Sequence, residues 1–229
     1  NQLGEHSYNE NLGFITIAIS TEPNNFDPRL TNDQASSRIF QLVYSSLMVL
    51  DDNLQVKPSL ALNLENPDPL TYIAHLKHGV YFHNDQELTS VDVVFTFESI
   101  LDQNSISPRK GAYRALDSVT ALDRYTVQFK LTEPFGAFPM QLVMPIVPKE
   151  SSRPLQSFPI GTGPYRFERY LVDDQVVLSS FENYYDGKPL NNGLILKVIP
   201  DDTMRGLELR KGTIDLVIND ISPDIVSQL

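Results

Sequence analysis

The sequence contains no cysteine, and it has no long apolar run. Without cysteine the chain cannot form a disulfide, a thiolate nucleophile or a cysteine-ligated metal site. It suits either a reducing cytosol or an oxidising space in which stray thiols are harmful. No apolar stretch approaches the roughly 20 residues that a membrane-spanning helix needs. No signal peptide is recognisable either, so we expect a chain that is cytosolic or already processed.

Basic residues are scarce as well. The 229 residues include 18 lysines and arginines against 29 aspartates and glutamates, for a net charge of -11. Nucleic-acid binding needs a concentrated basic face, and no such cluster is present, so we expect no nucleic-acid partner. The content of hydrophobic (41%) and charged (21%) residues is that of a globular protein, and the length allows one large or two modest domains.

Motifs of common enzymes are missing. There is no Gly-x-Ser-x-Gly elbow. Gly161-x-Gly163 lacks a third glycine and is followed by Pro164, which argues against a dinucleotide site. Adjacent carboxylates such as Asp201 and Asp202 lie in expected turns and helix caps. We therefore expect no catalytic residues, no cofactor and no enzymatic activity.

Three histidines, His75, His78 and His83, lie close together in the sequence and raise the question of a metal site. A zinc site needs three or four converging ligands. Strand alternation places the His75 side chain on the sheet face opposite to the one that the adjacent residues of the strand occupy. His78 stands at a turn before Gly79. We therefore expect no metal site.

A glycine- and proline-rich junction divides the chain at Phe158–Phe167. Glycines 161 and 163 allow unusual backbone angles, and Pro164 removes an N–H donor, so a turn is predicted. Two strands are predicted after it, at 165–170 and 175–180. We interpret the junction as the point at which the chain returns to its first lobe.

The first predicted strand, Ile15–Ile19, has at least one buried face. It ends in the loop Thr21–Pro28, and Asn32 or Asp33 is expected to cap the helix that follows. Loops at the ends of buried strands in α/β sheets often contact ligands. Glu22 faces either a cationic group or solvent.

The middle of the chain has an α+β character. The capping-box pair Thr89 and Asp92 opens one predicted helix. The expected elements are strands at 47–50, 72–76, 80–82 and 127–131, an edge or connector at 56–62, an antiparallel pair turning at 123–124, and helices from 88 to 101 and within 135–142.

The C-terminal part predicts a parallel β–α–β crossover. Strands are expected at 194–199 and, buried, at 214–218. The helix between them is expected to begin at Asp201 or Asp202 and to end at Gly212. A further helix is expected to start at Ser222-Pro223.

Several short motifs follow one another in the order found in a known family. The matching segments are Glu22-Pro23-Asn24-Asn25-Phe26-Asp27-Pro28, Val56–Ala61, Leu70–Asp85, Leu88–Phe95, Pro159–Tyr165, Asn183–Pro189 and Gly212–Asp215. Together they resemble the family-5 extracellular solute-binding proteins of bacterial ABC transporters, which include oligopeptide, dipeptide and nickel receptors. The sequence departs from the family pattern at Ala74, at Tyr185, and at Asp85, where a turn glycine is usual.

The resemblance implies a mixed α/β (α+β) fold, with lobe I of a type II periplasmic-binding-protein-like structure and an inserted α+β subdomain. Residues 1–13 would be a polar tail, 14–44 and 165–229 lobe I, and 45–164 the insert. Because family members are longer, the resemblance implies an N-terminal fragment whose second main lobe follows Leu229. Such a fragment is expected to fold but to bind ligand weakly or not at all.

The implied function is the substrate-binding component of an ABC importer, which captures peptides or a similar small solute and delivers them to a permease and ATPase. The resemblance implies a periplasmic or extracellular location, with or without a lipid anchor, and a monomer. Alternatives are the sensing module of a cytoplasmic transcriptional regulator and a receptor for nickel or a metal chelate. The residues expected to bind ligand are Glu22, Pro23, Asn24, Asn25, Phe26, Thr162 and Gly163.

Overall fold

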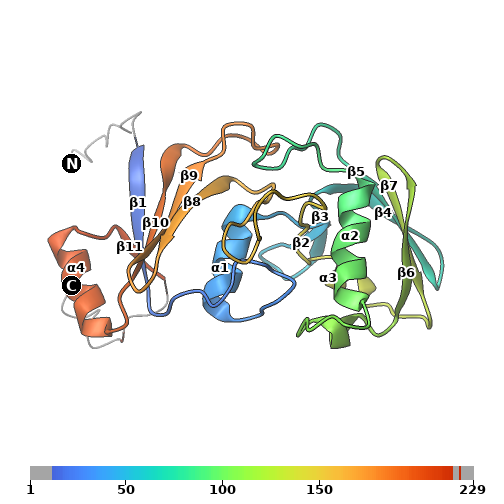
Figure 1. Ribbon diagram of the computed structural model, residues 1–229, viewed down its shortest axis with the longest axis horizontal. Coiled ribbons are helices and arrows are strands. Elements are labelled where there is room, and N and C mark those ends of the chain that lie inside the picture. The colour runs from blue at the N-terminus through green and yellow to red at the C-terminus, as the bar shows by residue number, and fades with distance from the viewer. Residues whose placement is uncertain (1–11, 219–221, 223–229) are drawn as a thin grey trace, which may run out of the picture.

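The structure, a computed structural model, describes residues 12–218 and 222. Figure 1 shows an elongated molecule with a five-stranded sheet at one end and a four-stranded sheet at the other, and a helix and a small hairpin between them. The expected tail lies almost entirely outside the described residues, and so does the helix expected from Ser222-Pro223.

The five-stranded sheet combines the start of the chain with its last third. Its strands are β1 (Leu12–Ile19), β8 (Tyr165–Leu171), β9 (Gln175–Ser180), β10 (Asn191–Val198) and β11 (Leu216–Val217). The order is β11-β1-β10-β9-β8, with β1 parallel to both of its neighbours and β8–β9–β10 antiparallel. The predicted parallel crossover is confirmed, and β1 lies between its two strands.

Helix α4 (Asp202–Lys211) makes that crossover and has the predicted ends. The Asp201 carboxylate accepts the Met204 backbone N–H at 2.8 Å, and Gly212 adopts a left-handed φ of 71°. The expected buried strand at 214–218 is shorter than predicted. Only Leu216 and Val217 pair with β1, and Leu216 is 45% exposed, whereas Ile214 is buried.

The four-stranded sheet is entirely antiparallel, in the order β4-β5-β7-β6. It consists of β4 (Ala61–Asp68), β5 (Thr71–Leu76), β6 (Leu116–Asp123) and β7 (Thr126–Leu131), with helix α2 (Ser90–Leu101) packed against it. The predicted capping box is confirmed, because the Asp92 carboxylate accepts the Thr89 N–H at 2.9 Å. Phe97 of α2 meets Phe129 of β7 edge to face.

Shorter elements join the two sheets. They are α1 (Gln34–Val43), β2 (Met48–Leu50), β3 (Val56–Pro58), the 3-10 helix η1 (Lys110–Tyr113) and α3 (Phe138–Gln141). Strands β2 and β3 pair with each other. Asp33 caps α1, because its carboxylate accepts the Ser36 N–H at 2.9 Å. It is one of the two residues that the sequence predicted as the cap.

One local prediction differs from the structure. The segment expected to be a strand at 80–82 contains only one isolated bridge, between Tyr81 and Glu87. The segment at 56–62, expected to be an edge or connector, forms β3 and the start of β4, and both are edge strands of their sheets. Asp85, which occupies a turn position where glycine is usual, has φ 65°, so it keeps the left-handed turn despite its side chain.

One continuous cluster of buried hydrophobic side chains connects the two ends of the molecule. It runs from Ile17 and Leu196 in the five-stranded sheet through Val43 of α1 to Phe97 and Phe129 in the four-stranded part. None of the helices in the described part of the chain is long and apolar enough to cross a membrane.

Candidate functional site

The loop after β1 is fixed by contacts with distant segments. The Phe26 N–H donates to the carbonyl of Gln156 at 3.2 Å, and the Tyr44 hydroxyl donates to the carbonyl of Phe26 at 2.9 Å. Phe26 is buried, whereas Asn24 is exposed. The buried Phe26 therefore holds the loop in place, while Asn24 keeps a polar side chain exposed. The loop follows a strand that has parallel neighbours on both sides.

Glu22 is oriented by the hairpin that joins β8 to β9. Its Oε2 accepts a hydrogen bond from the Tyr170 hydroxyl and another from the Asp173 backbone N–H. The bond from Tyr170, followed by that from Asp173, lowers the pKa of the Glu22 carboxyl below its usual value. No described residue bonds the second oxygen, Oε1, which leaves an ionised acceptor in a fixed position.

A hollow of about 520 Å³ opens beside this loop. It lies where the loop after β1 meets strand β8 and the segment before the glycine junction. Its lining residues are Pro23, Asn24, Phe26, Arg153, Gln156, Ser157, Phe158, Phe167, Glu168, Arg169 and Tyr170. Three of the seven residues predicted to bind ligand therefore line one hollow, and Glu22 is held by Tyr170 from the same lining.

Thr162 and Gly163 are buried apart from that hollow. The Gly163 N–H donates to Val43 O at 2.9 Å, and the Thr162 carbonyl accepts from the Ser45 hydroxyl at 3.3 Å. The Thr162 hydroxyl has no hydrogen-bond partner among the described residues and is fully enclosed. In this conformation both residues hold the C-terminal end of α1, and neither lies open to a ligand.

His83 binds the glycine junction from the other side. Its Nε2 lies 3.0 Å from the Gly163 carbonyl, which can only accept, so Nε2 carries the proton. Its Nδ1 accepts the Gly161 N–H at 3.4 Å. The pKa of His83 is lowered to about 4, chiefly by burial; the bond to Gly163 opposes this shift, and the charge of nearby Arg166 adds to it. His83 is thus a neutral structural residue at neutral pH.

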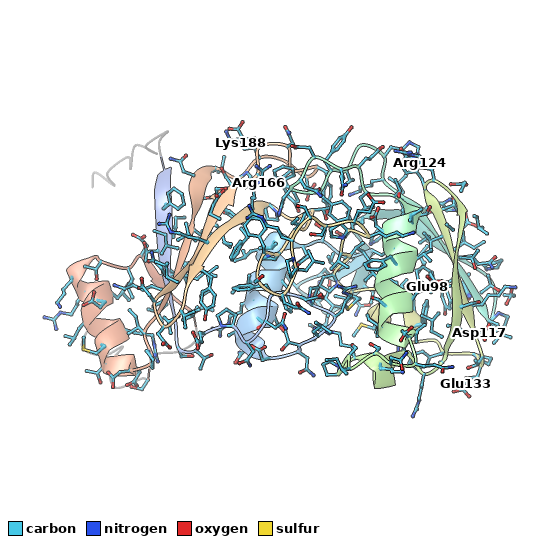
Figure 2. All side chains as sticks on the ribbon, viewed as in Figure 1. Glu98, Asp117, Arg124, Glu133, Arg166 and Lys188 are labelled. Carbon is cyan, nitrogen blue, oxygen red and sulfur yellow. The ribbon has the colours of Figure 1, made fainter. Side chains whose placement is uncertain are left out.

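Arg166 lies on β8, in the upper half of the view in Figure 2. Its guanidinium carbon is 5.3 Å from the centre of the Phe181 ring, and Phe181 meets the His83 ring edge to face at 4.9 Å. The side chains of Arg166, Phe181 and His83 therefore pack in a row against the glycine junction. This packing stabilises the return of the chain into β8.

A second hollow, also about 520 Å³, lies between α1 and the β2–β3 region. One face of α1 lines it through Ser37, Phe40, Gln41 and Tyr44, whose spacing follows the helical repeat. Its other lining residues are Ser45, Ser46, Val49, Leu50, Ser59, Arg109, Val143, Pro145, Pro164, Tyr184 and Tyr185. Sequence reasoning did not identify this surface, although the spacing on α1 was a readable signal.

The histidines do not converge. His75 pairs with Glu65 at 3.2 Å, His78 stacks on Tyr125, and His83 is buried at the junction. Within residues 12–218 and 222, no group of three histidine, aspartate or glutamate side chains is arranged to hold a metal ion.

The fold is that of the type II periplasmic binding proteins. The peptide-bound periplasmic binding protein DppA of Helicobacter pylori superposes with a TM-score of 0.88 at 27% identity, covering 96% of this chain and 49% of that one. The oligopeptide-binding protein AppA of Bacillus subtilis, solved with a nonapeptide, gives a TM-score of 0.84 at 32% identity, with 89% of this chain and 44% of that one covered.

The family model for bacterial extracellular solute-binding proteins, family 5, matches residues 55–229. The chain therefore belongs to this family, whose members are binding proteins rather than enzymes. Among curated relatives, AppA is 32% identical over 89% of this chain, and the heme-binding protein A of Haemophilus influenzae is 31% identical over 86%. The chain spans 40% and 42% of their respective lengths.

Proposed function

We propose that the protein is the substrate-binding component of an ABC importer that captures peptides or a similar small solute outside the cytoplasmic membrane. The observation that supports this most is the similarity, along 89% of the chain, to an oligopeptide-binding protein solved with a nonapeptide. The loop after β1 supports it independently, because it presents an oriented carboxylate beside a hollow of peptide-sized volume.

We further propose a division of the chain into lobe I, residues 14–44 and 165–229, and an insert, residues 45–164. In support, β1 joins β8–β11 in one sheet, whereas the four-stranded sheet is built only from residues between 61 and 131. Closure of lobe I over a ligand would shift an equilibrium between open and closed forms by differential affinity.

On lobe I, the proposed ligand contacts are the loop Glu22–Phe26 and the junction residues Thr162 and Gly163. The loop is the stronger part of this proposal, since Asn24 is exposed and Glu22 has an unbonded oxygen. Thr162 and Gly163 would reach a ligand only after the junction rearranges, because their backbone groups are already bonded.

The proposed partners are a membrane permease with its ATPase, which receive the ligand from a monomeric binding protein. We place the protein in the periplasm or outside the cell, with a lipid anchor as one form of attachment. It has no catalytic role in this scheme. The description of the family as extracellular supports the location.

A receptor for a nickel chelate is the second candidate. NikZ of Campylobacter jejuni, solved with Ni(L-His), gives a TM-score of 0.85 at 27% identity over 94% of this chain. A peptide ligand is favoured because the peptide-binding relative AppA has the higher identity, 32%. The alternative of a cytoplasmic regulator has no support among these relatives.

Isothermal titration calorimetry on the complete gene product tests the proposal. Peptides of two to nine residues and nickel–histidine are titrated separately. We expect micromolar or tighter binding of at least one peptide, with weaker binding by E22Q and unchanged binding by E182Q, which alters an exposed glutamate paired with Lys188. Binding of nickel–histidine alone would replace the peptide assignment, and binding of neither class would refute the proposal.

A further inference from the structure

Two side chains of the proposed insert are bonded to the loop between β1 and α1. Arg109 donates from Nε to the Pro28 carbonyl at 2.7 Å and from Nη2 to the Thr31 carbonyl at 3.2 Å. The Ser107 hydroxyl donates to the Arg29 carbonyl at 2.6 Å. The three carbonyls belong to no helix or strand, so these donors supply the bonds that a regular element would otherwise provide.

Arg29 connects the same two parts in the opposite direction. It extends from the loop to α2, where its Nη1 donates to the Ser99 hydroxyl at 3.0 Å and its guanidinium carbon lies 5.0 Å from the centre of the Phe95 ring. The Asp27 carboxylate accepts from the other side of this guanidinium, from Nε at 3.0 Å and from Nη2 at 2.7 Å. Such two-bond pairs fix orientation as well as position. One arginine from each part therefore crosses the boundary between the loop and the insert.

Asp27 links this half of the loop to the half that carries the proposed ligand contacts. Its backbone N–H donates to Asn25 Oδ1 at 2.8 Å, and its carbonyl accepts the Leu30 N–H at 3.0 Å. Asn25 is followed backwards along the chain by Asn24, which is exposed and lines the hollow. The Ser36 hydroxyl of α1 accepts the N–H groups of both asparagines, at 3.1 and 3.4 Å. The position of Asn24 thus depends on α1 and, through Asp27, on the insert.

The guanidinium of Arg109 differs from other arginine side chains in what it bonds. Arg124 pairs with the Glu87 carboxylate at 2.7 Å, whereas Arg109 has no carboxylate partner among residues 12–218 and 222. Moving a guanidinium partly out of water has a cost, which hydrogen bonds must offset. Here both bonds go to carbonyls of the loop, so their free energy favours one loop conformation.

We propose that Arg109 is a positioning residue, which holds the loop after β1 in the conformation that binds ligand. A loop that is ordered in advance binds more tightly, because less conformational freedom is lost when the ligand arrives. The effect on a ligand rests on the proposed function, whereas the effect on loop order does not. The inference gives the insert a role in affinity through a residue that acts on the loop.

Hydrogen–deuterium exchange of the complete gene product without ligand tests the effect on the loop. The amides of Asp27, Arg29 and Leu30 are bonded within the loop and report its order. In R109Q they should exchange about ten times faster or more, because two hydrogen bonds are lost. R109K keeps the charge without the planar fork, so we expect an intermediate rate. R114Q removes a nearby exposed arginine and is the matched control, with wild-type exchange.

Calorimetry tests the effect on binding. The peptide that the wild type binds most tightly in the titrations above is measured with R109Q, with N24A and with the double variant. R109Q should weaken binding about tenfold, and R114Q should not change it. If Arg109 acts through the loop, N24A should cost at least about threefold less in the R109Q background than in the wild type.

Circular dichroism reports folding, and R109K takes the place of R109Q in both measurements if R109Q does not fold. Wild-type exchange or wild-type affinity in the folded variant would overturn the proposal. So would independent effects of R109Q and N24A, which are expected if Arg109 touches the ligand directly from the second hollow, whose lining includes it. Faster loop exchange in R109Q, with no peptide bound by the wild type, would support the role of Arg109 in the loop and refute the proposed function.

Discussion

The Nε2 of His83 lies 3.0 Å from the carbonyl oxygen of Gly163, although 80 residues separate them in the chain. The same ring accepts the Gly161 N–H through Nδ1. A neutral imidazole satisfies both bonds, whereas a protonated one would present a donor to the Gly161 N–H. The junction that returns the chain to the five-stranded sheet therefore depends on the protonation state of one side chain.

We expect the folded protein to lose stability as the pH is lowered from about 6.5 to about 4, because of His83. Its pKa is lowered from 6.5 to about 4 in the folded protein, mainly by burial. In that interval the unfolded chain binds a proton that the folded chain does not, so acid favours unfolding, by roughly 3 kcal/mol at the lower end. Urea unfolding at pH 7 and pH 4.5 measures the difference.

H83Q is the informative variant, because it has no group that titrates in this range. Its stability should change less than that of the wild type between the two pH values, even if it is less stable at pH 7. H78Q, which removes an exposed histidine stacked on Tyr125, should retain the wild-type pH dependence. An equal slope for H83Q and wild type would contradict this account.

Gly161 is expected to tolerate no side chain. A Cβ at this position would lie 2.0 Å from the Val43 carbonyl oxygen and 2.8 Å from the Tyr44 ring. The backbone at the end of α1 would have to move, so G161A should lower the free energy of unfolding by about 3 kcal/mol or more. Thermal or denaturant unfolding measures the loss.

The control is G111A, where a Cβ would meet nothing within 4 Å. Its stability should stay within about 1 kcal/mol of the wild type. Similar stabilities for G161A and G111A would show that the junction yields more easily than the packing indicates.

Tyr170 is expected to set the pKa of Glu22. The Tyr170 hydroxyl is the main cause of the lowered pKa of the Glu22 carboxyl, followed by the Asp173 N–H. In Y170F that pKa should rise toward its ordinary value, because the ionised form loses its strongest donor. Since the folded carboxyl has the lower pKa, its stabilising effect exists above the unfolded pKa and is lost as pH falls. Y170F should therefore lose less stability than the wild type as the pH falls.

Carboxyl carbon NMR titration of labelled glutamate measures the pKa directly. Y81F, which alters an exposed tyrosine on another segment, serves as the control and should leave the Glu22 titration unchanged. An unshifted Glu22 resonance in Y170F would mean that the hydrogen bond does not persist in solution.

Asp33 is expected to stabilise α1 as its N-cap. Its carboxylate accepts the Ser36 N–H at 2.9 Å and the Thr31 hydroxyl at 2.6 Å. D33A leaves the helix N-terminus without this acceptor and should cost about 1 kcal/mol in the free energy of unfolding. N32A, one residue earlier and exposed, should cost much less. Denaturant unfolding of the two variants distinguishes a true cap from a general loop effect.

The candidate site was only partly predictable. The loop Glu22–Phe26 follows a strand with a clear alternating pattern, and a general rule for α/β sheets places ligand contacts there. Arg153 and Tyr170 carried no such signal, because each reaches the hollow from a segment more than 120 residues further along the chain. Thr162 and Gly163 were predicted from their position in the family motif, whereas the structure uses the missing side chain of Gly163 to pack the junction against α1.

The sequence by itself determined the local structure: the strand β1, the two helix caps to within one residue of Asp33 and Asp201, the left-handed end at Gly212, and the β8–β9 hairpin. These features depend on residues within one or two turns of one another, so propensity and spacing suffice. Only the tertiary structure decided that Glu22 meets Tyr170, that His83 meets Gly163, and that β1 lies between β10 and β11. Those pairings join segments far apart in the chain, and they form because burial of apolar surface selects one packing arrangement that local preferences leave open.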